Sequence, residues 1–223
     1  MLTLHHLEYS QSFRILWLLE ELGADYELKS YNRDPETNLA PADYKALSPL
    51  GTAPVVTDGD LVLAESNAVI DYILDGHPES PLNPKVGSAD RARHLFWYHA
   101  SPGSLMSIQG VAMVLNLLET RTPWPISALL KAVFGQVRKL FVNPRTEALY
   151  AMMEKDLGEK PFFGGDALTA ADITLVYAMY VARAKGAFES YPNILAWFDR
   201  IEALPSFQSA RAKDDRPHID FRF

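Results

Sequence analysis

The chain has 223 residues, enough for one large domain or two ordinary ones, of which 48% are hydrophobic and 22% charged. Its formal net charge of -7 argues against a nucleic-acid-binding surface, which would be basic. No apolar run approaches the roughly 20 residues of a membrane span. The opening MLTLHHLEYS also lacks the basic start and apolar core of a secretory signal. We therefore expect a cytoplasmic protein that binds neither nucleic acid nor a membrane.

The sequence contains no cysteine, which excludes disulfides, thiolate zinc sites and a cysteine nucleophile. Any thiol chemistry must therefore use the sulfur of a ligand. The six histidines show no pair at the spacing of helical metal ligands. His5 and His6 are adjacent in a predicted strand, so their side chains should point to opposite faces. We predict no metal site.

Strands and helices alternate over the first third of the chain. Residues 2–7 predict a short strand, and residues 13–23 carry apolar side chains on one face at helical spacing. Polar and apolar side chains alternate over 26–31, which predicts a second strand, and a short helix is expected over 41–47. This order predicts a small α/β domain built on a mixed sheet.

The next segment predicts a β-hairpin followed by a helix. Asp58-Gly59 lies between two apolar runs, and this dipeptide is the strongest short signal for a tight hairpin turn. Pro54 stands at the entry of the first run, where a missing N–H is tolerated. Glu65 and Ser66 follow the second run, and they place an acid and a hydroxyl at a helix start, where free N–H groups point outward.

Three prolines between residues 77 and 84 indicate a linker, because proline cannot continue a helix. Beyond it the patterns are helical. We expect an N-terminal domain over 1–77, a linker over 78–87 and an all-helical domain over 88–223.

Two dipeptides that contain proline should interrupt the helices in the second half of the chain. Pro102-Gly103 should kink the first long helix. Asn143-Pro144 should end the helix that starts near residue 126.

A capping box predicts the start of the central helix. Thr169 and Asp172 have the required spacing, with Asp in place of the usual Glu or Gln. The residues that follow are nearly uncharged up to about Ala184, which is typical of a buried central helix. We interpret this motif as structural. A short helix and a tail with Arg and Phe residues close the chain.

Four segments, taken together and in this order, resemble the cytosolic glutathione S-transferases. They are SPLGTAPVV at 48–56, LAESNAVIDYI at 63–73, LTAADITL at 168–175 and YPNILAWFDRIEALPSF at 191–207. The opening LHHLEYSQSFRILWLLEEL and the later WYHASPGSLM resemble the Gtt-like subgroup of bacteria and fungi. The resemblance implies an α/β thioredoxin-like N-terminal domain and an all-α C-terminal domain. It also implies glutathione as co-substrate and a homodimer with the helix after the linker in its interface.

The resemblance also implies a set of glutathione-binding residues: Thr52, Ala53, Pro54, Val55, Glu65 and Ser66. A cis bond before Pro54 would let the backbone of Val55 pair with the cysteinyl part of glutathione, as in strand addition. Ser66 at a helix start suits the γ-glutamyl carboxylate, and Glu65 suits the ammonium group.

Thr52 departs from the family pattern, in which many relatives carry a basic residue or Gln at this place. Thr52 cannot form an ion pair with the glycyl carboxylate of glutathione. The alternatives are that Lys45, Arg33 or another group makes that contact, or that the contact is weaker.

The family activates the thiol with a hydroxyl at the end of the first strand. Ser10 is the first candidate here, and Tyr9 and Ser12 are alternatives. A hydroxyl that donates to sulfur favours the thiolate, and the following helix adds a partial positive charge. Lowering the thiol pKa by about two units needs about 2.7 kcal/mol. Arg14 could add to this field or could face the domain interface.

The resemblance places the electrophile pocket between the domains, with His99, Ser101, Ser104 and Met106 as candidates. The implied function is a glutathione transferase that acts on an electrophile, for which we expect an apolar molecule. Two alternatives are a glutathione-dependent disulfide or peroxide reductase and a non-catalytic ligand-binding protein. The absence of cysteine excludes the cysteine-type transferases.

Overall fold

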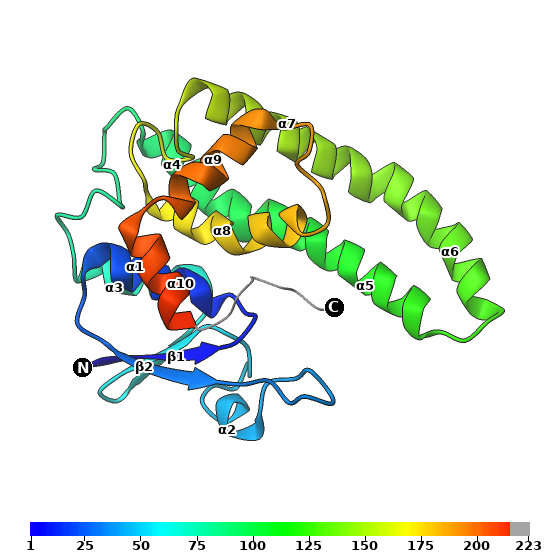
Figure 1. Cartoon of the computed structure of the whole chain (residues 1–223), viewed down its shortest axis with the longest axis horizontal. Helices are drawn as coiled ribbons and strands as arrows, with labels where there is room; N and C mark the ends of the chain where they lie inside the picture. The colour runs from blue at the N-terminus through cyan, green and yellow to red at the C-terminus, as the bar shows by residue number, and fades with distance from the viewer. Residues whose placement is uncertain (215–223) are drawn as a thin grey trace.

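The computed structural model describes residues 1–214, and Figure 1 shows the N-terminal sheet below a larger group of helices. Its four strands form one sheet in the order β2-β1-β3-β4. They are β1 (Leu2–Leu7), β2 (Glu27–Tyr31), β3 (Val55–Asp58) and β4 (Leu61–Ala64). β1 is parallel to β2 and antiparallel to β3, and β3 and β4 form the hairpin. The mixed sheet predicted from the sequence is confirmed.

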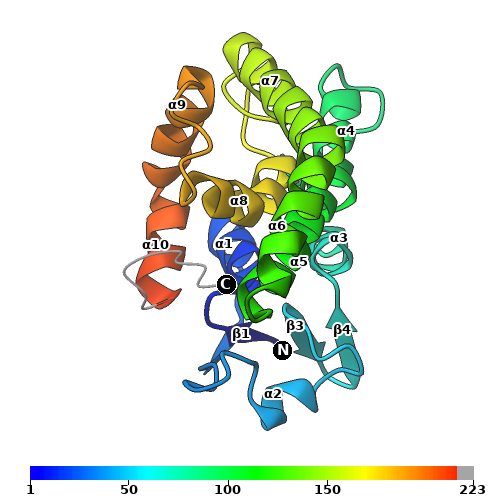
Figure 2. The same ribbon diagram turned by 90° about the vertical axis from the view of Figure 1, so that its right-hand side faces the viewer.

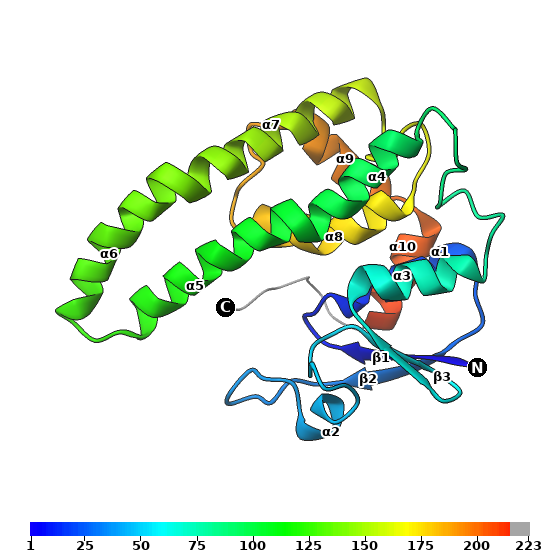
Figure 3. The ribbon, with the colours of Figure 1, turned by 180° about the vertical axis from the view of Figure 1, so that it is seen from behind.

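Alternation along β1 separates two packed layers. Leu4 belongs to the main core with α1 (Ser12–Leu22) and α3 (Ser66–Asp75), whereas His5 faces Tyr31 on the side of α2 (Ala42–Lys45). Figure 3 shows α1 and α3 on the upper side of the sheet and α2 below it. His5 and His6 therefore point to opposite faces, as predicted.

The remaining helices form the second domain. They are α4 (Arg91–Ala100), η1 (Ser101–Met106), α5 (Ser107–Arg121), α6 (Ile126–Val137), η2 (Arg138–Val142), α7 (Asn143–Glu159), α8 (Ala170–Arg183), α9 (Pro192–Glu202) and α10 (Pro205–Asp214). The thioredoxin-like domain followed by an all-helical domain is the predicted fold class. The tail that we expected after the last helix lies at 215–223, outside the described residues.

The predicted interruptions at proline take a different form. α4, η1 and α5 are continuous, as are α6, η2 and α7, so the expected helix end at Asn143-Pro144 is wrong. Pro102 lies inside η1, and Pro144 is the second residue of α7, just after η2; η1 and η2 are π-helical. Proline has no N–H to donate within an α-helix, and its ring clashes with the carbonyl group four residues earlier. A π turn shifts the local hydrogen-bond pattern by one residue, so the helix can continue past the proline.

The helix α8 is the buried centre of the second domain, as predicted. The Thr169 side chain accepts from the backbone N–H of Ala171, and Asp172 accepts from the N–H of Thr169, which completes the capping box. Most of α8 is buried. The motif is structural because it fixes where this central helix begins.

The last helix, α10, returns to the N-terminal domain and packs on α1. Phe207 meets the rings of Phe13 and Trp17 edge-on, with ring centroids 5.5 and 5.0 Å apart. Figure 2 shows α9 and α10 on one flank of the molecule, with α4 to α7 on the other. This packing brings Asp214, at the end of α10, against strand β1.

The continuous helix Arg91–Arg121 was not expected to have membrane-spanning character. Over its 31 residues it contains a window of mean hydropathy 1.2, and only 17% of that window is buried. Within residues 1–214 it is the one helix that meets this test, and it does so by length and composition alone. Its exposed apolar side chains include Phe96 and Val111.

Candidate active site

The loop between β1 and α1 holds the predicted thiol-activating hydroxyls. Ser10 donates from its Oγ to the carbonyl oxygen of Leu7, 2.7 Å away, and accepts from the N–H of Ser12 at 3.2 Å. The two serine hydroxyls are 2.8 Å apart. Tyr9, which precedes them, has φ 49°, a left-handed conformation that few non-glycine residues adopt. The loop is therefore held in one defined shape beside the end of β1.

The two serines differ in what surrounds them. Ser12 is fully buried, and its Oγ lies 2.8 Å from His6 Nδ1 while it accepts from the N–H of Leu7 at 3.1 Å. Ser10 keeps 7% of its surface exposed. Of the three hydroxyls considered from the sequence, Ser12 is the one enclosed on all sides. Ser10 and Tyr9 remain as candidates to meet a ligand.

The start of α3 lies beside this loop. Glu65 precedes α3 with φ 76° and ψ 121°, a strained backbone for a non-glycine residue, and strain of this kind clusters at functional sites. No side chain caps the helix. The Ser66 hydroxyl instead donates to Gln11 Oε1 at 3.1 Å. Gln11, which follows Ser10, thus joins the two segments, and its role was not predicted.

The Ala53–Pro54 bond is cis, as the resemblance implied. Val55, the first residue of β3, pairs with His5 on one side and Ala64 on the other. The backbone of Val55 therefore has strands on both flanks and no open edge for a peptide. Ala53 lies outside the ladder and is half-buried.

Arg14 is a buried cation behind the loop. It is 1% exposed and donates to Gln11 Oε1 at 2.8 Å and to the sulfur of Met106 at 3.0 Å. Its guanidinium lies 5.5 Å from the Tyr177 ring centroid. Burial lowers the pKa of Arg14 to about 9, so it is still positively charged at neutral pH. Arg14 faces the domain interface. It is also linked to Ser66, because both side chains donate to Gln11 Oε1.

Known proteins resemble this chain in sequence and in fold. The family models "Glutathione S-transferase, N-terminal domain" and "Glutathione S-transferase, C-terminal domain" match residues 1–75 and 129–214. Glutathione S-transferase 3 of Schizosaccharomyces pombe is 29% identical over 96% of this chain and 88% of its own. Glutathione S-transferase 1 of Saccharomyces cerevisiae is 27% identical, covering 96% and 95%. A solved glutathione S-transferase from Actinobacillus pleuropneumoniae is 33% identical, with a TM-score of 0.77, covering 96% and 93%.

The chain belongs to the glutathione S-transferase family. It is a glutathione transferase, and glutathione is its co-substrate. Within residues 1–214 no group of three or more His, Asp or Glu side chains is arranged to hold a metal ion.

In this transferase the candidates for the glycyl carboxylate lie in different settings. Thr52 is exposed in the loop before Pro54. Arg33 donates to the backbone carbonyls of Glu8 and Tyr9, at 3.0 and 3.2 Å, and to that of Asn38 at 3.0 Å. Arg33 therefore holds the loop that carries Tyr9 in place.

The four residues expected in the electrophile pocket do not lie together. Ser101 is fully buried and donates to the carbonyl of Thr174 at 2.7 Å, so it belongs to the core. Ser104 lines a groove between α4–α5 and α7. His99 is exposed. Met106, which contacts Arg14, is the one of the four on the side of the thiol-activating loop.

The expectation of one pocket from these four residues is therefore corrected. Successive helical residues are about 100° apart around the axis, so neighbours in sequence face different surroundings. One buried contact beside the β1–α1 loop could not be found from the sequence. His6 Nε2 lies 2.7 Å from Asp214 Oδ1, a contact between residues 208 positions apart.

Proposed function

We propose that this transferase binds glutathione where β1 ends and where β3 and α3 begin, and that Ser10 promotes ionisation of the thiol. One observation carries the proposal. Ser10 is the less enclosed member of the hydroxyl pair after β1, and its neighbour Gln11 is hydrogen-bonded to Ser66 at the start of α3. A ligand that reaches from Ser66 to Ser10 would span the predicted site.

The γ-glutamyl end of glutathione suits the start of α3. This helix begins without a side-chain cap, so its first N–H groups can bind a carboxylate, and the helix dipole favours the negative charge. The hydroxyl of Ser66 adds a donor. Glu65 is exposed at the same turn and suits the ammonium group.

The cysteinyl part needs an open stretch of backbone to pair with. Among the predicted residues we assign this contact to Ala53, because Val55 is enclosed between β1 and β4. Pro54 holds the turn at the strand entry, and we assign the glycyl end to the hydroxyl of Thr52, which is exposed in the preceding loop.

Thiol ionisation would combine three effects. The Ser10 hydroxyl donates to the sulfur, the start of α1 adds partial positive charge, and the buried Arg14 adds a full charge behind the loop. A hydrogen bond to a charged group contributes about 1.5–3 kcal/mol. That is comparable with the roughly 2.7 kcal/mol that a two-unit fall in the pKa of the thiol requires.

The thiolate would then attack an electrophile held between the domains. Met106 and Tyr177, which contact Arg14, give this side an apolar and aromatic lining. We therefore infer that the second substrate is apolar. We further infer that the reaction takes place in the cytoplasm.

The assignment of Ser10 is tested with Ser10→Ala and Tyr9→Phe. Thiolate formation is followed by its ultraviolet absorbance while pH is varied, alongside turnover of an aryl halide. We expect Ser10→Ala to raise the apparent pKa of bound glutathione by about one to two units, whereas Tyr9→Phe leaves it unchanged. If Tyr9→Phe raises this pKa and Ser10→Ala does not, Tyr9 is the activating residue and the assignment is wrong.

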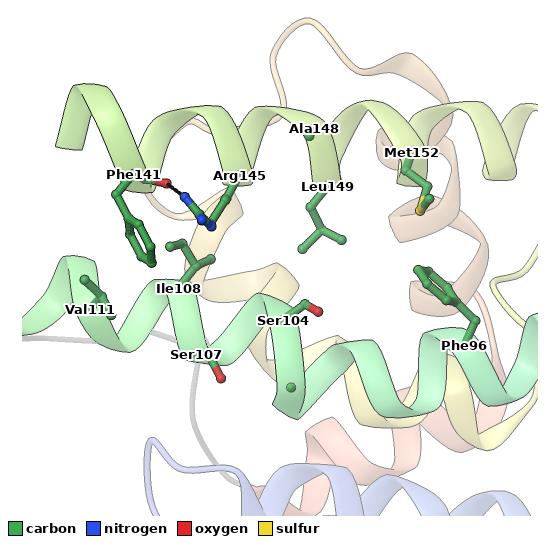
Figure 4. Close-up of a pocket in the computed structure, with 11 residues that line it drawn as sticks. Phe96, Ser104, Ser107, Ile108, Val111, Phe141, Arg145, Ala148, Leu149 and Met152 are labelled. Atoms are coloured by element: carbon green, nitrogen blue, oxygen red, sulfur yellow. Dashed lines mark hydrogen bonds between the residues drawn. The ribbon is translucent and has the colours of Figure 1, made fainter. Parts of the chain in front are cut away.

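We also propose that the transferase is a homodimer and that a second copy covers the groove between α4–α5 and α7. Figure 4 shows Phe96 and Met152 at one end of this groove and Val111 and Phe141 near the other. Its volume is about 530 Å³. Phe96, Phe141 and Met152 are 42–48% exposed in the single chain. A face this apolar is typical of an obligate interface.

Sedimentation equilibrium tests the dimer. We expect a species of twice the 25.0 kDa of one chain, and the double variant Phe96→Asp/Met152→Asp should sediment as a monomer. The substitution Lys85→Asp, at an exposed residue that does not line the groove, is the control. A wild-type protein that sediments as a single chain at micromolar concentration would contradict the proposal.

A further inference from the structure

A line of four buried groups leads from the proposed thiol-activating hydroxyl into the protein. Ser10 Oγ is 2.8 Å from Ser12 Oγ, which is 2.8 Å from His6 Nδ1. His6 Nε2 is 2.7 Å from Asp214 Oδ1. All four residues are less than 9% exposed, and Ser10 is the member nearest the predicted glutathione site. Each step is a short hydrogen bond.

Asp214 determines the direction of the two bonds made by His6. A carboxylate can only accept, so His6 places its proton on Nε2 and donates it to Asp214. In the neutral ring Nδ1 is then an acceptor, and Ser12 is the hydroxyl that faces it. The single proton of Ser10 Oγ has two acceptors within reach, the carbonyl oxygen of Leu7 at 2.7 Å and Ser12 Oγ at 2.8 Å, and the relay uses the second. The donors thus point along the line toward Asp214, and His6 Nδ1 carries no proton of its own and can accept one.

The charged groups placed against His6 come from α10. Asp214 contacts the ring directly, and Arg211 Nη1 lies 3.5 Å from the other oxygen of Asp214. From α1, His6 meets the hydroxyl of Ser12, and its register neighbour on β2 is Ser30.

We propose that Ser10, Ser12, His6 and Asp214 form a relay that takes up the proton of the glutathione thiol. The proposal rests on the proposed role of Ser10. The S–H bond breaks, and its proton passes to Ser10 Oγ while the proton of Ser10 moves to Ser12 Oγ. The proton of Ser12 moves to His6 Nδ1. The sulfur keeps the electron pair, Ser10 is left donating to the thiolate, and His6 becomes an imidazolium paired with Asp214.

This arrangement has a consequence that a purely structural contact lacks. If His6 and Asp214 only tied α10 to β1, the protonation of His6 would be indifferent to the ligand. In the relay His6 gains a proton when glutathione ionises, and the thiolate forms without an equal release of protons to solvent. His6 and Asp214 act through Ser12 and Ser10, so they are positioning residues and do not touch the substrate.

Nitrogen NMR of the full-length protein, labelled in its histidines, tests the relay directly at neutral pH. We expect His6 to be a neutral ring protonated on Nε2 in the free protein and with S-methylglutathione, which has no thiol proton. With glutathione it should show the imidazolium signature. His5→Gln, on the opposite face of β1, assigns the signals. The same neutral signature in all three samples would overturn the relay.

A count of protons gives a second readout. A pH indicator measures protons released on mixing with glutathione, and ultraviolet absorbance measures thiolate formed. The wild type should release clearly fewer protons than thiolates. His6→Gln and Asp214→Asn should release one proton per thiolate and form about tenfold less thiolate at neutral pH. Asp214→Glu should restore part of the effect.

Ser209→Ala is the matched control, because it weakens a contact of α10 to Glu20 on α1 without touching the line. It should behave as the wild type. If the wild type ionises glutathione through Ser10 and both relay variants keep the wild-type proton count, the relay fails and the proposed function stands. If Ser10→Ala ionises glutathione as well as the wild type, both fail.

Discussion

Two buried carboxylates of the helical domain, Asp172 and Asp214, have similar burial and different partners. Asp172 accepts from the N–H groups of Phe163, Thr169 and Trp197 at 2.8, 3.1 and 2.9 Å. Asp214 faces His6 and, on its other oxygen, Arg211. Asp172 lies at the start of α8, in the centre of the domain, whereas Asp214 ends α10 beside the active-site loop.

The difference lies in what the partners can do with a proton. Backbone and indole N–H groups keep theirs, so Asp172 can only hold α8, Phe163 and α9 together. Burial raises the pKa of Asp172, and its N–H donors oppose that rise by stabilising the carboxylate. The imidazole of His6 can gain a proton, so Asp214 can transmit a change of charge. Of these two similarly buried carboxylates, Asp172 therefore stabilises the fold, and Asp214, in our proposal, takes part in the chemistry.

Removing Asp172 should have the largest effect on stability. Asp172→Asn keeps the shape but turns an amide N–H toward buried N–H donors, and Asp172→Ala leaves those donors without an acceptor. We expect each variant to lower the free energy of unfolding by roughly 4 kcal/mol. Urea unfolding measures this from the midpoint at an unchanged slope. A loss below about 1 kcal/mol would mean that the cluster does not anchor α8.

His94 extends the comparison to a buried ring that lacks a carboxylate. It is 3% exposed, stacks on Tyr98, and its Nδ1 has no hydrogen-bond partner among residues 1–214; burial lowers its pKa to about 4. The unfolded chain takes up this proton below about pH 6.5 and the folded chain only near pH 4. Stability from His94 is thus complete above pH 6.5 and falls as the pH drops toward 4.

We expect about 2 kcal/mol of the loss in unfolding free energy between pH 7 and pH 4.5 to come from His94. His94→Phe keeps the ring stacking and should remove this part of the acid sensitivity. The readout is the difference between the two proteins in urea midpoint across that pH range. An identical pH dependence in both would show that His94 is protonated in the folded protein.

The pair His6–Asp214 should show a smaller energetic coupling. A double-mutant cycle with His6→Gln and Asp214→Asn is expected to give about 2 kcal/mol, because both groups are buried and hydrogen-bonded. The cycle is read by urea unfolding near pH 6. Additive effects of the two substitutions would show that the contact contributes nothing to the folded state and would weaken the comparison with Asp172.

The role of Asp172 could be predicted from the sequence, whereas the contact of Asp214 could not. Thr169 and Asp172 are three residues apart, so local capping rules predict their contact. The cis bond at Pro54 and the strained turn before Ser66 lie in sequence segments that resemble the glutathione S-transferases. His6 and Asp214 are joined by the docking of α10 on α1, which no local pattern encodes.

The remaining errors also come from tertiary context. Pro144 was expected to end a helix, but η2 accommodates it within a continuous one. Ser101 and Ser104 were grouped because they are close in sequence, yet one faces α8 and the other an open groove. Val55 follows the cis proline as predicted; its neighbour β4 follows from the predicted hairpin, but its neighbour β1 is known only from the sheet order.

A structure of the protein with glutathione bound tests the central claim most directly. The measured quantity is the distance from the glutathione sulfur to the hydroxyls of the β1–α1 loop. We predict that the sulfur lies within hydrogen-bond reach of Ser10 Oγ, at about 3–3.5 Å, with the γ-glutamyl carboxylate at the start of α3 beside Ser66. A sulfur that contacts the Tyr9 hydroxyl, or no hydroxyl of this loop, would contradict the claim.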